Sequence, residues 1–181
     1  MAAVRALLAI LLVGIATAAA GQRTEATEAS LKAAYLFKFA GYIEWSATDF
    51  ASPEAPIAIG VVGADEIAAE LYRIVAGRSI AGHPVAVKRF AEGEAARGVQ
   101  MLFVGREAPK LAGTVRAAQA QGILVVTDTE RGLEMGGAIN FVPQGERLGF
   151  EVSLDSAEKS GHRISSRMLN VARRVVQKGA S

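Results

Sequence analysis

The chain has 181 residues, enough for one domain with a substantial core, and its 51% apolar and 21% charged residues are typical of a folded protein. Its 20 Lys and Arg against 18 Asp and Glu give a formal net charge of +2, which is too balanced to predict nucleic-acid binding. The sequence contains no Cys, which excludes disulfide bonds and thiolate chemistry.

The first segment has the layout of a secretory signal peptide. Arg5 supplies a positive start, an apolar stretch covers 6–16, and small residues precede Gly21. This stretch is much shorter than the roughly 20 residues that span a bilayer, which argues against the alternative of an uncleaved anchor. We therefore predict a signal peptide over 1–20, a polar lead-in over 21–30, one domain over 31–178, and export across the inner membrane.

Residues 31–45 predict a helix, because Leu, Lys and Ala are good helix formers and no Pro interrupts them. The segment is apolar on nearly all sides and rich in aromatic residues. Side chains that point in all directions cannot all face one sheet, so some should reach a partner or dimer interface, where Tyr and Trp are favoured. The alternative is that these rings are simply core. The candidate interface residues are Tyr35, Phe39, Tyr42 and Trp45.

From residue 57 onward, predicted strands alternate with predicted helices. The strands cover 57–62, 85–87, 101–104 and 123–126, with a turn at 82–84, and the helices cover 64–76 and 110–121. Such alternation predicts βαβ units and a largely parallel sheet.

The last third predicts a different arrangement. Strands over 138–142 and 148–154 flank the loop 143–147, which indicates an antiparallel hairpin. A short helix capped by Asp155 and a final helix running to about Lys178 should follow. The expected fold class is therefore α/β: a single domain whose mixed, mostly parallel sheet of about five or six strands is flanked by helices, with a C-terminal antiparallel hairpin.

Two predicted strand ends carry candidate ligand-binding residues. Gly63 and Asp65 follow the first strand of the alternating region, and Asp128 follows the strand over 123–126. Ligands of α/β proteins bind outside the carboxyl ends of parallel strands. However, the segment at Gly63 lacks both the G-x-G-x-x-G spacing and the Lys of a phosphate-binding loop, and Asp65 is placed to cap a helix. A structural turn and a solvated loop are the competing interpretations.

The residues that usually carry catalysis or metals form no recognisable pattern. The histidines, His83 and His162, lie in predicted turns without a second ligand at metal-binding spacing. Serines lie near His162, but no G-x-S-x-G elbow is present. We therefore predict no catalytic residue, no metal and no cofactor. An unrecognised hydrolase remains a rival that would need acid–base groups converging in a cleft.

Taken together, several segments resemble the YfiR-like family of periplasmic proteins. They are LKAAYLFKFAGYIEW at 31–45, PIAIGVVG at 56–63, GRSIAGHPV at 77–85, GILVVTD at 122–128, GGAINF at 136–141, FEVS at 150–153 and ISSRML at 164–169.

The resemblance implies a non-enzymatic periplasmic α/β protein that is usually a homodimer. Relatives restrain an inner-membrane diguanylate cyclase by binding its periplasmic sensor portion, and an outer-membrane lipoprotein can sequester them. The expectation is thus a negative regulator of cyclic-di-GMP signalling and biofilm formation, acting through a protein–protein contact. The alternative is a periplasmic small-molecule sensor whose ligand lies near Gly63 or Asp128.

Overall fold

The computed structural model describes residues 27–91, 93–145 and 147–177, so the predicted signal peptide lies outside the described residues. The helices are α2 (Glu28–Ala40), α3 (Asp65–Val75), α4 (Leu111–Ala120), α5 (Leu154–Lys159) and α6 (Ser166–Leu169), with one 3-10 turn, η1 (Ala47–Asp49). The strands are β1 (Ile43–Glu44), β2 (Ile57–Val62), β3 (Ser79–Ile80), β4 (His83–Phe90), β5 (Met101–Val104), β6 (Leu124–Thr127), β7 (Ile139–Gln144), β8 (Arg147–Ser153), β9 (Arg163–Ile164) and β10 (Arg174–Val176). Within the described ranges, no helix combines the length and apolarity needed to cross a membrane.

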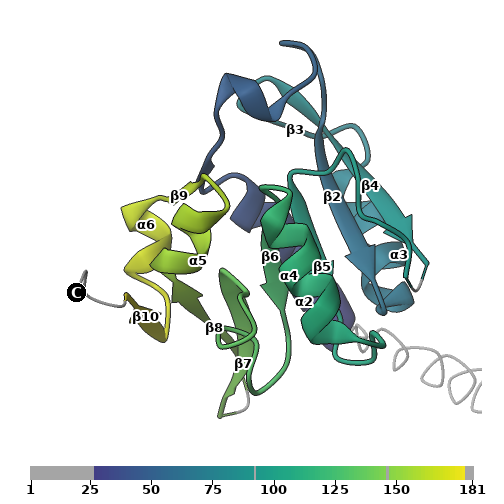
Figure 1. Cartoon of the computed structure of the whole chain (residues 1–181). Helices are drawn as coiled ribbons and strands as arrows, with labels where there is room; N and C mark the ends of the chain where they lie inside the picture. The colour runs from purple at the N-terminus through teal and green to yellow at the C-terminus, as the bar shows by residue number, and fades with distance from the viewer. Residues whose placement is uncertain (1–26, 92, 146, 178–181) are drawn as a thin grey trace, which may run out of the picture.

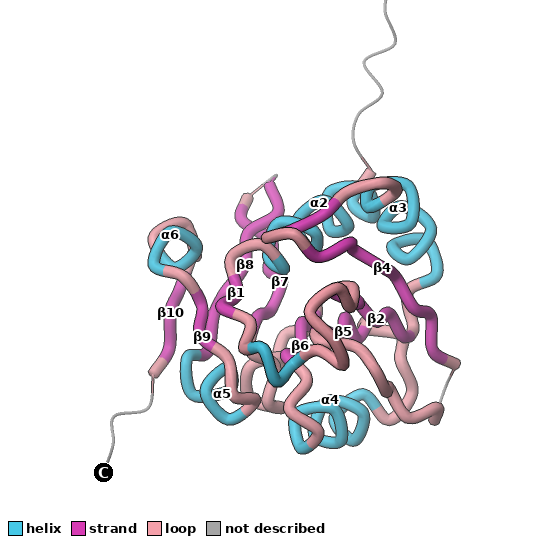
Figure 2. Tube along the Cα trace, turned by 90° about the horizontal axis from the view of Figure 1, so that it is seen from above, coloured by secondary structure: helices cyan, strands magenta, loops and turns pink. Residues whose placement is uncertain are grey.

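Eight strands form the main sheet in the order β10-β8-β7-β6-β5-β2-β4-β3. Neighbours from β7 through β4 run parallel, while β7–β8 and β3–β4 are antiparallel. Helices α2 and α3 cover one face and α4 and α5 the other (Figures 1 and 2). The predicted α/β class, mostly parallel sheet and C-terminal hairpin are confirmed, although the predicted number of strands was too small.

Strand β2 is buried on both faces because it lies inside the sheet. Ile57, Ile59 and Val61 belong to the core under α2 and α3, whereas Ala58 and Val62 belong to the core under α4. A continuous apolar run is what a strand covered on both sides requires. The bounds of this strand agree with the prediction.

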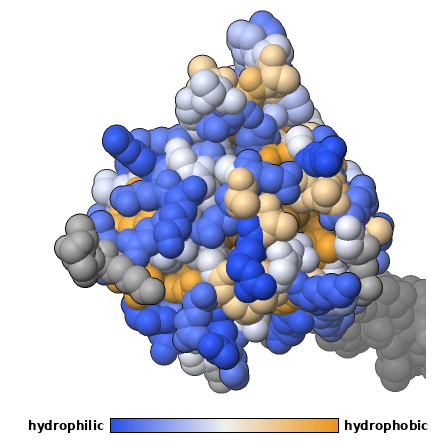
Figure 3. All heavy atoms as spheres, viewed as in Figure 1, coloured by the Kyte–Doolittle hydropathy of each residue, from blue (hydrophilic) through white to orange (hydrophobic). Residues whose placement is uncertain are grey.

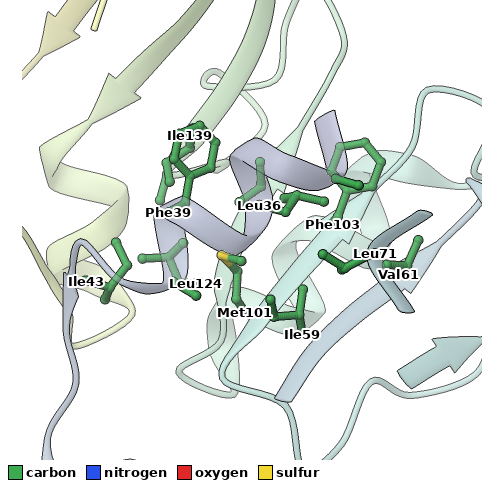
Figure 4. Close-up of a cluster of buried hydrophobic side chains, with 14 of the residues drawn as sticks. Leu36, Phe39, Ile43, Ile59, Val61, Leu71, Met101, Phe103, Leu124 and Ile139 are labelled. Atoms are coloured by element: carbon green, nitrogen blue, oxygen red, sulfur yellow. The ribbon is translucent and has the colours of Figure 1, made fainter. Parts of the chain in front are cut away.

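Helix α2 begins and ends earlier than predicted. Thr27 caps it by accepting a hydrogen bond from the main-chain N–H of Ser30 (3.1 Å), and the helix ends at Ala40. Leu36 and Phe39 point into the core toward β5, β6 and β7 (Figure 4). After the helix the chain extends as β1, which pairs with β9 in a small second sheet.

The predicted final helix to about Lys178 is wrong. Helix α6 covers only four residues, and the chain then adds β10 to the sheet edge, parallel to β8. Val175 and Val176 are β-branched and favour a strand once an edge is available to pair with. Arg174 also forms an ion pair with Glu151 of β8 (2.6 Å). Lys178 lies outside the described residues.

Two further local predictions are corrected. Ser153, not Asp155, caps α5 by accepting a hydrogen bond from the main-chain N–H of Ser156 (3.3 Å). Strand β4 begins at His83, inside the predicted turn, because His83 and Pro84 pair with β3. Both corrections move an element boundary by a few residues and leave the topology as predicted.

Candidate functional site

Four charged side chains meet near the carboxyl ends of the central strands, and we call them the charge cluster: Glu28, Lys32, Arg106 and Asp128. Lys32 Nζ donates to Glu28 Oε1 and, at 2.8 Å, to Asp128 Oδ2. Arg106 reaches the same two carboxylates, each at 3.3 Å. Helix α2 supplies the first two residues, and the segments that follow β5 and β6 supply the others. The cluster therefore joins positions far apart in the sequence.

The inner half of the charge cluster is buried and the outer half is exposed. The side chains of Lys32 and Asp128 are 4% and 6% exposed, whereas those of Glu28 and Arg106 are 65% and 59% exposed. A buried ammonium is tolerated only when it is paired, which Asp128 achieves. However, Asp128 Oδ1 is buried and has no hydrogen-bond partner among the described residues. An acceptor in that state lowers stability unless something donates to it.

Two hollows flank the charge cluster, and all four of its residues line both. The larger, about 860 Å³, extends toward the β7–β8 hairpin. The smaller, about 430 Å³, lies at the β2–α3 junction and is lined by all three predicted ligand-pocket residues, Gly63, Asp65 and Asp128. The structure thus brings together the two strand ends that the sequence singled out. That they bind a ligand stays a prediction.

Main-chain atoms from two loops pack closely beside the smaller hollow. Gly63 has a left-handed φ of 65°, and a Cβ placed on Gly105 would lie 2.2 Å from the Gly63 oxygen. Glycine is needed there because the segments after β2 and β5 touch. Asp65 is the first residue of α3 rather than its cap, so the predicted capping role is wrong. It pairs instead with Arg89 of β4 (2.6 Å).

The smaller hollow carries an excess of negative charge. The two bases of the charge cluster face five acids, which are Glu28, Asp65, Glu66, Glu107 and Asp128. A hydrogen bond from Lys32 and the positive charges of Lys32 and Arg106 hold the pKa of Glu28 below its ordinary 4.5, although partial burial opposes this. The hollow therefore favours a cation over an anion.

The lowered pKa of Glu28 predicts how stability changes in acid. A group whose pKa is lowered by folding contributes stability that is complete above about pH 4.5 and is lost as the pH falls through the folded-state pKa. Glu28→Gln should therefore flatten the acid side of the stability profile between pH 5 and 3, by less than about 1 kcal/mol because the side chain is mostly exposed. Urea unfolding at each pH measures this, with exposed Glu158→Gln on α5 as the control. A Glu28→Gln profile parallel to wild type would contradict it.

The predicted interface residues fall into different environments. Phe39 is 2% exposed and packs against Phe150 with ring centroids 4.9 Å apart, so its assignment to an interface is corrected to the core. Tyr35 joins the same ring cluster and is half-buried. Trp45 is also half-buried, and its Nε1 donates to the Ala40 oxygen (2.8 Å). Tyr42, at 39% exposed, is the most exposed of the four.

Sequence reasoning missed Glu28, Lys32 and Arg106. Two signals could have found them. Glu28 and Lys32 are four residues apart, the spacing at which helical side chains pair. Arg106 follows β5 and ends at the same sheet edge as Asp128, so the rule that selected Asp128 applied to it too.

The histidines have structural partners in this fold. His83 stacks on Phe50 (centroids 4.1 Å apart), and its Nδ1 lies 2.8 Å from the Ala55 oxygen. His162 is buried, with Nε2 2.9 Å from the Gly122 oxygen. In the part of the chain that the structure describes, no three or more His, Asp or Glu residues are grouped so as to hold a metal ion.

The chain was compared with protein families, curated proteins and solved structures. The model of the YfiR/HmsC-like family matches residues 29–173. No curated protein matches the chain. A conserved domain protein from Vibrio cholerae O1 biovar El Tor aligns with a TM-score of 0.56 at 12% identity, covering 83% of this chain and 60% of that one. The ABC domain in complex with L-Trp from Streptococcus pneumoniae aligns at 0.49 and 15% identity, covering 66% and 56%. At such identities, the Vibrio structure supports the fold alone.

Proposed function

Because the chain belongs to the YfiR/HmsC-like family of periplasmic regulators of cyclic-di-GMP signalling, we propose that it restrains an inner-membrane diguanylate cyclase by binding the cyclase's periplasmic sensor portion. The family match carries this proposal, since it spans 29–173 and so nearly all of the described domain. Nucleotide substrates are cytoplasmic, so a periplasmic protein reaches such a cyclase only through the part exposed in the periplasm. The signal peptide proposed for 1–20 would deliver the chain there.

The exposed apolar side chains support a particular docking surface. The large ones among the described residues are Tyr42, Tyr72, Val171 and Val175. The main-chain N–H of Ser165, just before α6, donates to the main-chain carbonyl oxygen of Tyr42 (2.9 Å), which places the Tyr42 backbone beside the start of α6. Val171 and Val175 follow α6 in the chain. We call Tyr42, Val171 and Val175 the C-terminal apolar surface; Figure 3 shows apolar patches over this end of the molecule.

Docking at the C-terminal apolar surface accounts for both the restraint of the cyclase and its release, because both partners would use the same contact. An exposed aromatic ring that becomes desolvated on binding is a common anchor of protein interfaces. An outer-membrane lipoprotein that bound the same surface would free the cyclase by competition, to the extent that its affinity exceeds that of the sensor portion. Pairing of two copies through this surface is the rival use of it.

Tyr42→Ala should weaken binding to the sensor portion by about tenfold or more, because it removes an interface anchor without opening the core. Tyr72→Ala is the matched control: Tyr72 is 47% exposed but lies on α3, at the other end of the sheet from α6 (Figure 1). Binding is measured with the purified periplasmic portion of the cyclase. In cells, deleting the gene should raise cyclic-di-GMP, and restoring wild type or Tyr72→Ala should lower it again.

Three results would count against this assignment. Cyclic-di-GMP that does not change on deletion would remove the restraining function itself. Equal binding by Tyr42→Ala and Tyr72→Ala would move the docking surface elsewhere. Loss of self-association in Tyr42→Ala, with cyclase binding intact, would make the C-terminal apolar surface a dimer contact.

Small-molecule sensing is a second candidate function, and one observation favours it. Asp128 Oδ1 has no hydrogen-bond partner among the residues that the structure describes. Asp128 also lines a hollow at the carboxyl ends of parallel strands, where α/β proteins bind ligands.

A further inference from the structure

The two basic partners of Asp128 hold it in different ways. Lys32 is buried and lies 2.8 Å from Oδ2, a normal length for a charge-assisted hydrogen bond. Arg106 reaches Oδ2, and also Glu28, only at 3.3 Å, and its side chain is 59% exposed. Long, exposed ion pairs contribute little free energy. Arg106 can therefore leave the carboxylates at small cost.

Asp128 still lacks one donor with both bases in place. Lys32 and Arg106 both donate to Oδ2, while Oδ1 is buried and receives no hydrogen bond from any described residue. An ionised carboxylate accepts hydrogen bonds through both oxygens. The side chain is more than nine-tenths buried, so bulk water satisfies Oδ1 poorly. The missing group is an N–H or O–H donor, and the smaller hollow, which Asp128 lines, is the side from which one can approach.

The charge of the smaller hollow selects among donors. Five acids and two bases line it, and the acids remain in excess although Arg89, outside the lining, pairs with Asp65, so a cation is attracted and a phosphate or carboxylate is repelled. A metal ion fits poorly, because no described His, Asp or Glu residues converge to hold one and Lys32 Nζ already lies between Glu28 and Asp128. An organic cation can instead present several N–H donors to oxygens that remain in place.

From these contacts we infer that the smaller hollow binds a small organic cation, a primary amine or guanidinium compound, which displaces Arg106 and donates to Asp128 Oδ1. One cationic end of the ligand takes the place of the Arg106 guanidinium beside Glu28 and Asp128, so both carboxylates keep a positive neighbour. The volume of about 430 Å³ lies in the range of small-ligand sites. This inference names the ligand for the sensing function, the second candidate above, and stands apart from cyclase restraint.

Thermal unfolding of the protein without the proposed signal peptide, in the presence of putrescine or agmatine, tests the inference. We expect at least one of them to raise Tm in proportion to the logarithm of its concentration above Kd, by about 5–10 °C at 100 times its Kd. 1,4-Butanediol, which has the length of putrescine without its charge, should have no effect, and neither should MgCl2 at matched ionic strength. No shift with either amine, or an equal shift with butanediol or MgCl2, would overturn the inference.

Two variants test whether the ligand displaces Arg106 or is bound by it. Arg106→Gln removes the internal competitor and should tighten amine binding about three- to tenfold in calorimetry. Arg131→Gln alters another exposed, ion-paired arginine (77% exposed against 59% for Arg106) that lies outside the smaller hollow, and it should leave amine binding unchanged. Weaker binding by Arg106→Gln would overturn the inference, because Arg106 would then be a ligand contact.

Asp128→Asn should lower the affinity at least tenfold, since it removes the acceptor's charge while keeping its shape. Wild-type affinity in that variant would overturn the inference. If Asp128→Asn does not fold, the comparison of Arg106→Gln with Arg131→Gln decides. Because amine binding is measured on the chain alone, its failure is distinguishable from a failure of cyclase restraint, which is measured with the cyclase's periplasmic portion and in cells.

Discussion

Replacing Phe39 with alanine should lower the free energy of unfolding by about 3–5 kcal/mol, the usual loss when a buried Phe is truncated. Phe39 is 2% exposed, and its ring lies 5.5 Å from that of Phe141 and 4.9 Å from that of Phe150 (centroid distances). These strand residues come from both arms of the β7–β8 hairpin, so the cavity would loosen the contact between α2 and the hairpin. Urea unfolding measures the loss.

Two companion variants sharpen this prediction. Phe39→Leu keeps most of the apolar volume and should lose clearly less than Phe39→Ala. Tyr42→Ala removes an exposed ring from the same region of the chain and should change stability by only a few tenths of a kcal/mol. A Phe39→Ala variant as stable as Tyr42→Ala would mean that Phe39 is not core, and its assignment to an interface would return.

Lys32→Met should also destabilise the protein by about 3–5 kcal/mol, because it leaves the buried Asp128 carboxylate without its ammonium partner. The double variant Lys32→Met/Asp128→Leu should recover much of that loss, since it removes both charges from the interior. A double-mutant cycle by urea unfolding measures the coupling. Arg106→Gln is the control and should lose less than about 1 kcal/mol, because Arg106 is mostly exposed.

The outcome of this cycle also bears on function. A large coupling energy would show that Lys32 and Asp128 hold each other in place. A ligand could then replace Arg106 at the carboxylates without disturbing this inner pair. Additive losses would mean that the two charges act independently, which would contradict the pairing seen at 2.8 Å.

Helix α2 connects the two proposed sites. Glu28 and Lys32 lie in its first half, and Tyr42 follows its end, about 15–20 Å from them at the rise of an α-helix. A ligand at the charge cluster would alter docking at Tyr42 only if it bound one position of α2 more tightly than another. Cyclase affinity measured with and without a saturating amine gives that coupling directly.

Local sequence signals were sufficient for much of the framework. Strands β2 and β5 have the predicted bounds, because short continuous runs of apolar residues are typical of strands buried on both faces. The hairpin was likewise predictable from its loop. Helix ends were less so: the 31–45 pattern continues past Ala40, yet pairing of β1 with β9 draws the chain out of the helix.

By itself, the sequence determined the alternating α/β framework and the strand ends where a ligand site could form, since these depend on hydrophobic patterning over a few neighbouring residues. Only the tertiary structure decided that Phe39 is core while Tyr42 is exposed, that the chain after α6 becomes an edge strand, and that Lys32 pairs with Asp128. Those outcomes depend on which surface each segment meets: Lys32 and Asp128 are 96 positions apart, and no local pattern records that they touch.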